Sequence, residues 1–462
     1  MLRSVTTLPS FAAFALVCAL ASQAHAHEPP HGIGLAWPRP EADSTPIILT
    51  NRGLIFANDG GASRFSLRCN ESYGVVSGAR PELSLDDQGA VVIASTLDIQ
   101  RTSDLSCTHS SATGLPTGDE AASLDLSLGG FATDPSKPGR ALASTQAYKV
   151  PAQVFVSEDY ARTWAPLSTN ATLSVYKSLL IAEDGLHVLA GGSRYDQPKN
   201  KTLSIYAYSS DGGKTWTDAD VDAVREPLGF LPGDSNIAFM REQLPNQVID
   251  PRDKLLRSSD GGKTFELIGD TFPSLSAFAA TPDGKTVWVG ARFGGLFQSD
   301  DSGKTFARVL PDQINGSDCL YFRQDVLWAC NNIAPNTDGI YTSKDLGKSF
   351  QEHMRFEEVA TQVECADVEI CEQAWRDWDY ELRNGWNSTD GGPAPIEDAG
   401  ARDAPDAGVT VELDAGHDAE REAGHDAGPE QPRKEEGCAL GGRNEGGLLA
   451  LALAALLRRR RR

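Results

Sequence analysis

Basic side chains are scarce in this chain of 462 residues. Lysine and arginine together number 42, against 64 aspartate and glutamate residues, which gives a formal net charge of −22. A protein that binds nucleic acid needs a basic surface to displace counterions from phosphate groups. The charge balance therefore argues against nucleic acid as a partner.

Methionine and long apolar stretches are also scarce. The chain has only 3 methionines, whereas glycine and proline number 44 and 26. Hydrophobic residues make up 40% of the sequence, close to the globular average, so most of the chain can build a core. This composition predicts many turns and few long helices.

An apolar stretch lies near the N-terminus. Arg3 precedes an apolar run over residues 11–21, and the small residues Ala24 and Ala26 follow it. The run is shorter than the ~20 residues that a membrane-spanning helix needs. Residues 1–26 are therefore predicted to be a secretory signal peptide cleaved after Ala26, and the protein is expected to be exported.

The region after residue 386 is strongly acidic. Residues 387–436 hold 14 acidic and 4 basic side chains, with Asp-Ala-Gly repeated four times and almost no large apolar residue. Such a segment cannot bury enough surface to offset its ordering entropy. We expect a disordered acidic spacer over 387–436, with cation binding by its aspartates as the less favoured alternative.

Residues 437–462 combine Gly437-Cys438, an apolar run over 448–457 and five arginines over 458–462. The apolar run would span about 15 Å as a helix, half of a bilayer core. The stretch resembles the myxobacterial C-terminal sorting signal. That resemblance implies cleavage by a sorting protease next to Cys438, display at the cell surface or outer membrane, and membrane contact only through this anchor.

A short motif repeats along the middle of the chain. Its pattern is Ser-x-Asp-x-Gly-x-Thr/Ser-Trp/Phe, with alanine replacing glycine at position 161, and two degenerate copies precede five clear ones. The aspartates of the seven copies are Asp59, Asp104, Asp159, Asp211, Asp260, Asp301 and Asp345, and the aromatic residues that end the clear copies are Trp164, Trp216, Phe265, Phe306 and Phe350.

The residue types of the motif suit a tight turn. Aspartate and glycine supply side-chain-to-backbone hydrogen bonds and a positive φ, and the closing aromatic residue packs beneath the loop. Apolar β-rich runs flank the copies, so each motif is predicted to join two strands of a hairpin. Many repeats show a second hairpin signal upstream, such as EDGLHVLAGG at 183–192. Two hairpins give four strands per repeat.

This motif is identified as the Asp-box, or BNR repeat. The resemblance implies that residues 27–386 form an all-β fold, a seven-bladed β-propeller of four-stranded blades. Six blades with an extra N-terminal element is the alternative, because the first two copies are degenerate. In the families that carry the motif, its aspartates are structural, so we expect them to be structural here.

Eight cysteines are present, of which Cys18 lies in the leader and Cys438 in the sorting signal. An even number remains in a chain predicted to be exported, which favours three disulfides over a metal site. Cys319 and Cys330 flank a hairpin and suit a cross-strand bridge. The six cysteines permit 15 pairings. We also expect a bridge between neighbouring blades near Cys69 and Cys107, and a loop-helix cap that holds Cys365 and Cys371.

No catalytic or metal site emerges from the sequence, and no cofactor is expected. A sialidase, one activity found among Asp-box propellers, would normally show an Arg-Ile-Pro signature, which is missing here. A glycosidase with two catalytic carboxylates stays open, because sequence does not say which acidic residues face each other. His27 and His31 could bind copper, but we favour the interpretation that they belong to a flexible polar start of the chain. His109 is expected to be structural.

Two hypotheses follow. The favoured one is a surface-displayed, non-catalytic propeller that binds a protein or glycan ligand, because function in such folds lies in variable loops grafted on fixed blades. The alternative is a secreted glycoside hydrolase of the Asp-box propeller type.

Overall fold

The structure of the protein is a computed structural model. It describes most of the region predicted to hold the repeats, and the signal peptide, the acidic spacer and the sorting signal, with Ala26, Gly437 and Cys438, lie outside the described residues. The described residues are 30–38, 45–58, 64–73, 82–86, 88–95, 98–103, 107–116, 127–146, 153–169, 174–196, 200–244, 252–292, 294–309, 314–331, 339–365 and 368–384.

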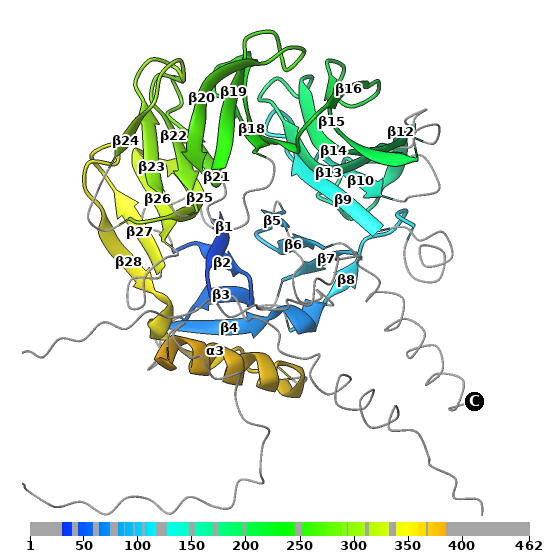
Figure 1. The fold of residues 1–462 in the computed structure, drawn as a ribbon. Coiled ribbons are helices and arrows are strands. Elements are labelled where there is room, and N and C mark those ends of the chain that lie inside the picture. Colours follow the sequence, from blue (N-terminus) through cyan, green and yellow to red (C-terminus); the bar gives the residue numbers. More distant parts are fainter. Residues whose placement is uncertain are drawn as a thin grey trace, which may run out of the picture. The chain divides into compact units, whose positions relative to one another are not determined.

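The chain forms a seven-bladed β-propeller, as predicted, in which each blade is a sheet of four consecutive antiparallel strands (Figure 1). The first strand of each blade lies nearest the centre of the ring and the fourth lies at the rim. Blade 1 contains β1 (Gly32–Ala36), β2 (Ile47–Thr50), β3 (Gly53–Ala57) and β4 (Phe65–Cys69); blade 2 contains β5 (Glu82–Leu85), β6 (Val91–Ala94), β7 (Ile99–Thr102) and β8 (Ser110–Ser111); blade 3 contains β9 (Ser127–Thr133), β10 (Ala141–Gln146), β11 (Gln153–Ser157) and β12 (Ala165–Thr169).

The remaining blades have longer and more regular strands. Blade 4 contains β13 (Ser174–Ile181), β14 (Val188–Asp196), β15 (Lys201–Ser209) and β16 (Thr217–Val221); blade 5 contains β17 (Arg225–Leu231), β18 (Asp234–Gln243), β19 (Arg252–Ser258) and β20 (Glu266–Pro273); blade 6 contains β21 (Leu275–Ala280), β22 (Val287–Ala291), β23 (Gly295–Ser299) and β24 (Ala307–Val309); blade 7 contains β25 (Ser317–Arg323), β26 (Val326–Asn331), β27 (Gly339–Ser343) and β28 (Gln351–Arg355).

The repeated motif forms the turn between the third and fourth strands of blades 3 to 7. In blade 4 the Ser209 hydroxyl donates to Asp211 Oδ1 over 2.8 Å and accepts the N–H of Gly213 over 2.9 Å. The other carboxylate oxygen of Asp211 accepts the Thr215 hydroxyl over 2.6 Å. The same bonds recur in the turns of Asp159, Asp260, Asp301 and Asp345. The turn is therefore closed by its own side chains, and Asp59 and Asp104 lie outside the described residues.

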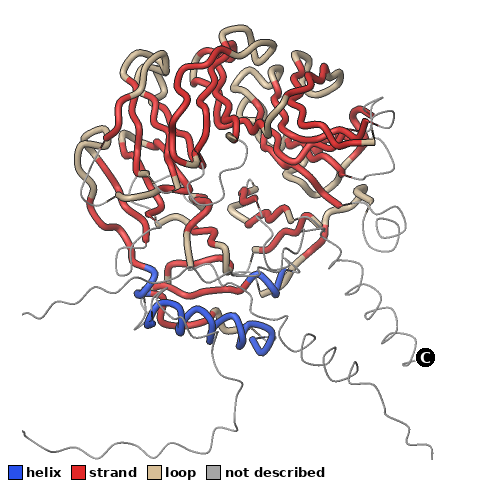
Figure 2. Tube along the Cα trace, in the orientation of Figure 1, coloured by secondary structure: helices blue, strands red, loops and turns tan. Residues whose placement is uncertain are grey.

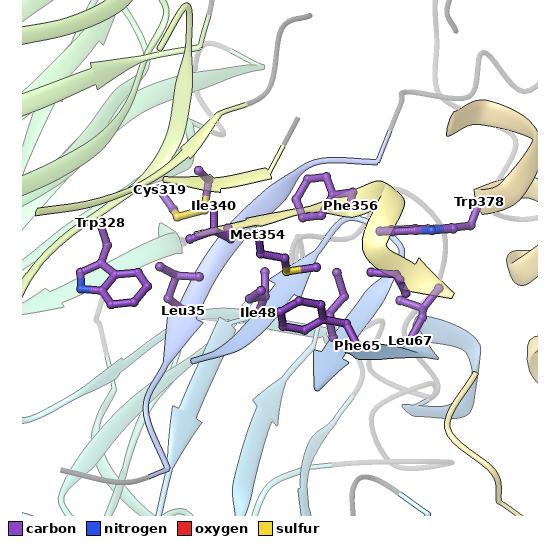
Figure 3. Close-up of a cluster of buried hydrophobic side chains, with 13 residues drawn as sticks. Leu35, Ile48, Phe65, Leu67, Cys319, Trp328, Ile340, Met354, Phe356 and Trp378 are labelled. Carbon is purple, nitrogen blue, oxygen red and sulfur yellow. A yellow bond between two sulfur atoms is a disulfide. The ribbon is translucent and has the colours of Figure 1, made fainter. Parts of the chain in front are cut away.

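The C-terminal end of the propeller closes the ring on blade 1. After blade 7 the chain passes through the short helix η2 (Phe356–Glu358) into β29 (Val359–Gln362), which pairs in parallel with β4 as a fifth strand. The helices η3 (Val368–Cys371) and α3 (Glu372–Asn384) follow, and Figure 2 shows the helical segments gathered beside blade 1. Trp378 of α3 is 1% exposed and packs against Phe356, with ring centroids 5.8 Å apart (Figure 3).

Three disulfides are present. Cys319–Cys330 is the predicted cross-strand bridge of blade 7, between paired residues of β25 and β26. The other two bridges are Cys69–Cys371 and Cys107–Cys365. They do not link Cys69 to Cys107, as a bridge between neighbouring blades would. They tie blades 1 and 2 to the C-terminal segment instead, because β29 carries that segment to the rim of blade 1.

Among the described residues, no helix is long and apolar enough to cross a membrane.

Candidate functional site

A cavity lies at the centre of the ring and has a volume of about 490 Å³. That volume is typical of sites for small molecules or short chain segments. It is lined by residues near the start of inner strands, such as Glu226 of β17 and Ser276 of β21, and by residues at the end of second strands, such as Gln243 of β18. Antiparallel strands alternate in direction, so these positions lie at the end of each blade opposite the repeated turns.

The side of the cavity formed by blades 4 to 7 is entirely polar. Its uncharged members are Gln243 and the serines Ser178, Ser274 and Ser276. Its charged members are Lys177, Glu226, Arg241, Arg292 and Asp318. The inner strands of four different blades thus bring hydrogen-bonding groups to one volume.

Arg241 holds two acidic groups at this wall. Its Nε donates to Glu226 Oε2 over 2.9 Å, and its Nη1 lies 3.5 Å from Asp253 Oδ2. Burial raises the pKa of the Asp253 carboxyl, and the neighbouring Arg241 offsets part of that shift. Asp253 also accepts the backbone N–H of Leu275 over 2.7 Å. The guanidinium of Arg241 is therefore fixed between two carboxylates of its own blade and the carbonyl oxygen of Leu275 in blade 6, to which its Nη1 donates over 2.6 Å.

A second cluster joins the N-terminal segment to blades 6 and 7. The carboxylate of Asp318, 3% exposed, lies 3.4 Å from Arg292 Nε and 3.8 Å from His31 Nε2. His31 is itself only 3% exposed. The expectation of a flexible polar start to the chain is thus wrong for His31, because β1, which begins at the next residue, packs beside β25 and holds His31 near Asp318. His27 lies outside the described residues.

The side of the cavity formed by blades 2 and 3 is mainly apolar, with Glu82 and Ser95 at its edge. Two glycines of β9 explain its shape. A Cβ on Gly129 would lie 2.0 Å from the carbonyl oxygen of Tyr176, and one on Gly130 would lie 2.6 Å from Leu179 N. Without side chains there, β9 packs closely on β13 of blade 4, and the cavity extends into the seam between blades 2 and 3. The apolar residues of this seam are Ala94, Ile99, Leu128, Phe131 and Ala143.

The residues singled out from the sequence do not lie at this cavity. The five described motif aspartates lie in rim turns at the opposite end of the blades, and hydrogen bonds within the turn hold them. Their aromatic partners pack in the blades: Trp216 Nε1 donates to Gly213 O over 2.9 Å, and Phe265 packs edge-to-face on Tyr206 of the preceding blade. His109 packs edge-to-face on Tyr73.

Sequence reasoning did not find the charged residues of the cavity. Lys177, Glu226 and Asp318 each interrupt the apolar pattern near the start of an inner strand. That interruption, repeated from blade to blade, was the available signal. No group of three or more histidine, cysteine, aspartate or glutamate side chains within the described ranges is arranged to hold a metal ion.

No protein-family model matches the chain, and no curated protein matches it. Among solved structures, hydrazine synthase of Kuenenia stuttgartiensis is 10% identical with a TM-score of 0.48, covering 69% of this chain and 96% of that one. YCF48 of Cyanidioschyzon merolae is 13% identical with a TM-score of 0.40, covering 60% and 87%. The GH93 alpha-L-arabinofuranosidase of Fusarium graminearum is 16% identical with a TM-score of 0.37, covering 57% and 92%. Likenesses this weak carry no argument about function.

Proposed function

We propose that this chain is an exported, non-catalytic β-propeller that binds a glycan or protein ligand in its central cavity. The observation that carries the proposal is the convergence of polar side chains from blades 4 to 7 on one cavity of about 490 Å³. Such a cavity with a few fixed polar groups is the usual form of a binding site. The ion pairs of Arg241 and Arg292 preorganise its wall, which lowers the entropy lost on binding.

Hydrolysis of a glycoside is the second candidate, because Glu82, Glu226 and Asp318 all line the cavity. A hydrolase needs one carboxyl group that holds a proton and another that stays ionised. Glu226 bonds to Arg241, and Asp318 lies within ion-pair distance of Arg292, so each of these carboxylates already has a basic partner. This arrangement suits binding better than acid catalysis.

The cellular location of the protein is part of the same proposal. The leader ending at Ala26 would direct export, and the Asp-box turns would place the chain among exported Asp-box propellers. A sorting protease would cleave beside Gly437 and Cys438, leaving the protein at the cell surface. The three disulfides of the propeller are in keeping with an oxidising compartment.

The test is a binding screen of the mature chain on a glycan array and a peptide library. Gln243→Trp fills the cavity from the end of β18, and Thr217→Trp, on the exposed rim strand β16, is the matched control. We expect the hits to lose at least about tenfold in affinity with Gln243→Trp and to keep it with Thr217→Trp. Ligands whose affinity is unchanged by Gln243→Trp would place the binding surface elsewhere. Release of sugar from a glycan on the array would favour the hydrolase.

A further inference from the structure

The two sides of the central cavity, formed by different sets of blades, differ in polarity. Every lining residue that follows β12 along the chain, from Lys177 to Asp318, is polar. Opposite them, the seam between blades 2 and 3 contributes buried side chains such as Ile99, Leu128 and Phe131, which are 0%, 5% and 9% exposed. A ligand that fills this cavity must present a polar face to one side and an apolar group to the other.

Three of the five charged lining residues on the polar side are basic, and the remaining lining carboxylate, Glu82, lies at the edge of the opposite side. Arg241 is compensated by Glu226, and Arg292 is compensated by Asp318. Lys177 is exposed and lines the same cavity, and no carboxylate in the described part of the chain lies within ion-pair distance of its ammonium group. Since the two arginines are already neutralised, Lys177 is the group left to attract an anion.

The apolar side lies beside β9, which packs closely on β13 of blade 4. The close approach of Gly129 and Gly130 to β13 leaves a recess bounded by small residues, Ala94 of β6 and Ala143 of β10. Phe131 and Leu128 supply the larger apolar surfaces. A recess of this kind accepts one compact apolar group and rejects a fully hydroxylated one, whose hydroxyls would lose their hydrogen bonds to water.

We infer that the ligand of this cavity is amphipathic: a carboxylate that pairs with Lys177, joined to an apolar group that enters the seam between blades 2 and 3. The inference rests on the proposed binding function and narrows it to one ligand chemistry. Two sources share that chemistry, the carboxyl-terminal end of a peptide with an apolar last side chain and a medium-chain fatty acid.

The test is calorimetric titration of the mature full-length chain with defined probes. N-acetyl-L-phenylalanine carries both groups, N-acetyl-L-phenylalaninamide lacks the charge, and N-acetylglycine lacks the apolar group. We expect each of the two incomplete probes to bind at least about tenfold more weakly than the complete one, since a charge-assisted hydrogen bond and a buried phenyl ring each contribute that much or more. Octanoate replaces the complete probe in a parallel series and distinguishes a fatty acid from a peptide end.

Protein variants test the same two contacts. Lys177→Met is expected to reduce the affinity for N-acetyl-L-phenylalanine to that of its amide, whereas Lys214→Met, an exposed lysine of a rim turn, leaves the preference intact. Ala143→Leu fills the recess and should weaken the acid and the amide equally. Because Ala143 is 1% exposed and its replacement can disturb folding, the N-acetylglycine comparison tests the recess without any mutation.

Three results would overturn the inference: equal binding of the acid and its amide, equal binding of N-acetylglycine and N-acetyl-L-phenylalanine, or no binding of any apolar carboxylate. If array hits still depend on Gln243 while these probes fail, the proposed function stands and only the ligand chemistry is wrong. If no hit depends on Gln243, the proposed function fails as well.

Discussion

At the scale of single residues, some of the repeated turns place side chains where other turns place glycine. Gly212 and Gly261 have φ values of 76° and 75°, and the equivalent Leu346 has a φ of 60°. A left-handed conformation costs a residue with a Cβ roughly 1–2 kcal/mol. Glycine avoids this cost, but its unfolded chain has more conformational freedom to lose on folding, which offsets part of the gain. Leu346 is 39% exposed, so its side chain contributes little burial.

We therefore expect Leu346→Gly to raise the free energy of unfolding by about 0.5 kcal/mol, as measured by urea denaturation. Gly347→Ala is the matched opposite change, because Gly347 has a φ of 82° and an added Cβ would lie 3.2 Å from Trp288 Nε1. That variant should lose about 1 kcal/mol or more. A destabilised Leu346→Gly would show that the leucine side chain itself holds the turn.

The motif carboxylates should make stability depend on acid pH. Hydrogen bonds from the Ser349 hydroxyl, the Ser349 N–H and the Ser343 hydroxyl lower the pKa of Asp345 from 3.8 to about 2. A folded-state pKa below the unfolded value stabilises the protein above about pH 4, and that stabilisation is lost as the pH falls toward 2.

Thermal melts at pH 6 and pH 3 test this dependence. We expect Asp345→Asn to lower the melting temperature at pH 6 and to have a smaller effect at pH 3, because pH 3 lies between the folded and unfolded pKa values and part of the stabilisation is already lost there. Asp222→Asn, at an exposed aspartate of a blade connection, is the control and should change neither value. An effect of Asp345→Asn that is the same at both pH values would mean that the charge plays no part.

At the scale of elements, the hairpins were predictable and the ring closure was not. The turn chemistry of each motif and the apolar runs beside it are local signals, so the four strands of each blade could be read from sequence. The parallel pairing of β29 with β4 joins residues almost 300 positions apart, for example Val359 with Phe65. No local pattern encodes such a contact, and the same is true of Cys69–Cys371. The cavity was missed for this reason too: its lining residues are spread over six blades, and no blade supplies more than five of them.

The two kinds of disulfide should therefore differ in their effect on stability. Cys69–Cys371 closes a loop with a sequence separation of 302, whereas Cys319–Cys330 closes one of 11. Because Cys107–Cys365 lies inside the first loop, the unfolded segment that Cys69–Cys371 closes shrinks to about 45 residues, and loop-closure entropy assigns about 4 kcal/mol to this bridge and about 3 kcal/mol to Cys319–Cys330. We expect the double replacement of Cys69 and Cys371 by serine to lower the midpoint of chemical unfolding more than the double replacement of Cys319 and Cys330. The reverse order would show that blade 7, not the closure, limits stability.

At the scale of the whole molecule, residues 27–386 should behave as one folding unit. The repeats run without interruption from blade 1 to blade 7, and the C-terminal segment is bonded back to blades 1 and 2. We expect an expressed 27–386 fragment to melt in one transition and to show a circular dichroism spectrum dominated by strands. Two well-separated transitions, or a strongly helical spectrum, would contradict a single propeller.

The tail is expected to be a processed anchor. The apolar run over 448–457 has ten residues and would reach only about half-way across a bilayer core, so it is too short to hold the protein there permanently. Gly437-Cys438 supplies a compact cleavage site and a thiol that a lipid can modify, and the acidic residues 387–436 would repel one another and extend as a spacer. The mature protein from its host should then end at Gly437 or Cys438 and lack Arg458 to Arg462.

Mass spectrometry of protein released from the cell surface measures this end directly. Cys438→Ala should leave the tail uncleaved and reduce surface display, while the propeller keeps the melting temperature of the wild type because the substitution lies outside residues 27–386. Cys319→Ala, which breaks the Cys319–Cys330 disulfide of the propeller, is the control: it should lower the melting temperature and leave tail cleavage intact. A displayed protein that still ends in five arginines would mean that the tail is a retained anchor, held by its basic end on the cytoplasmic side of the membrane.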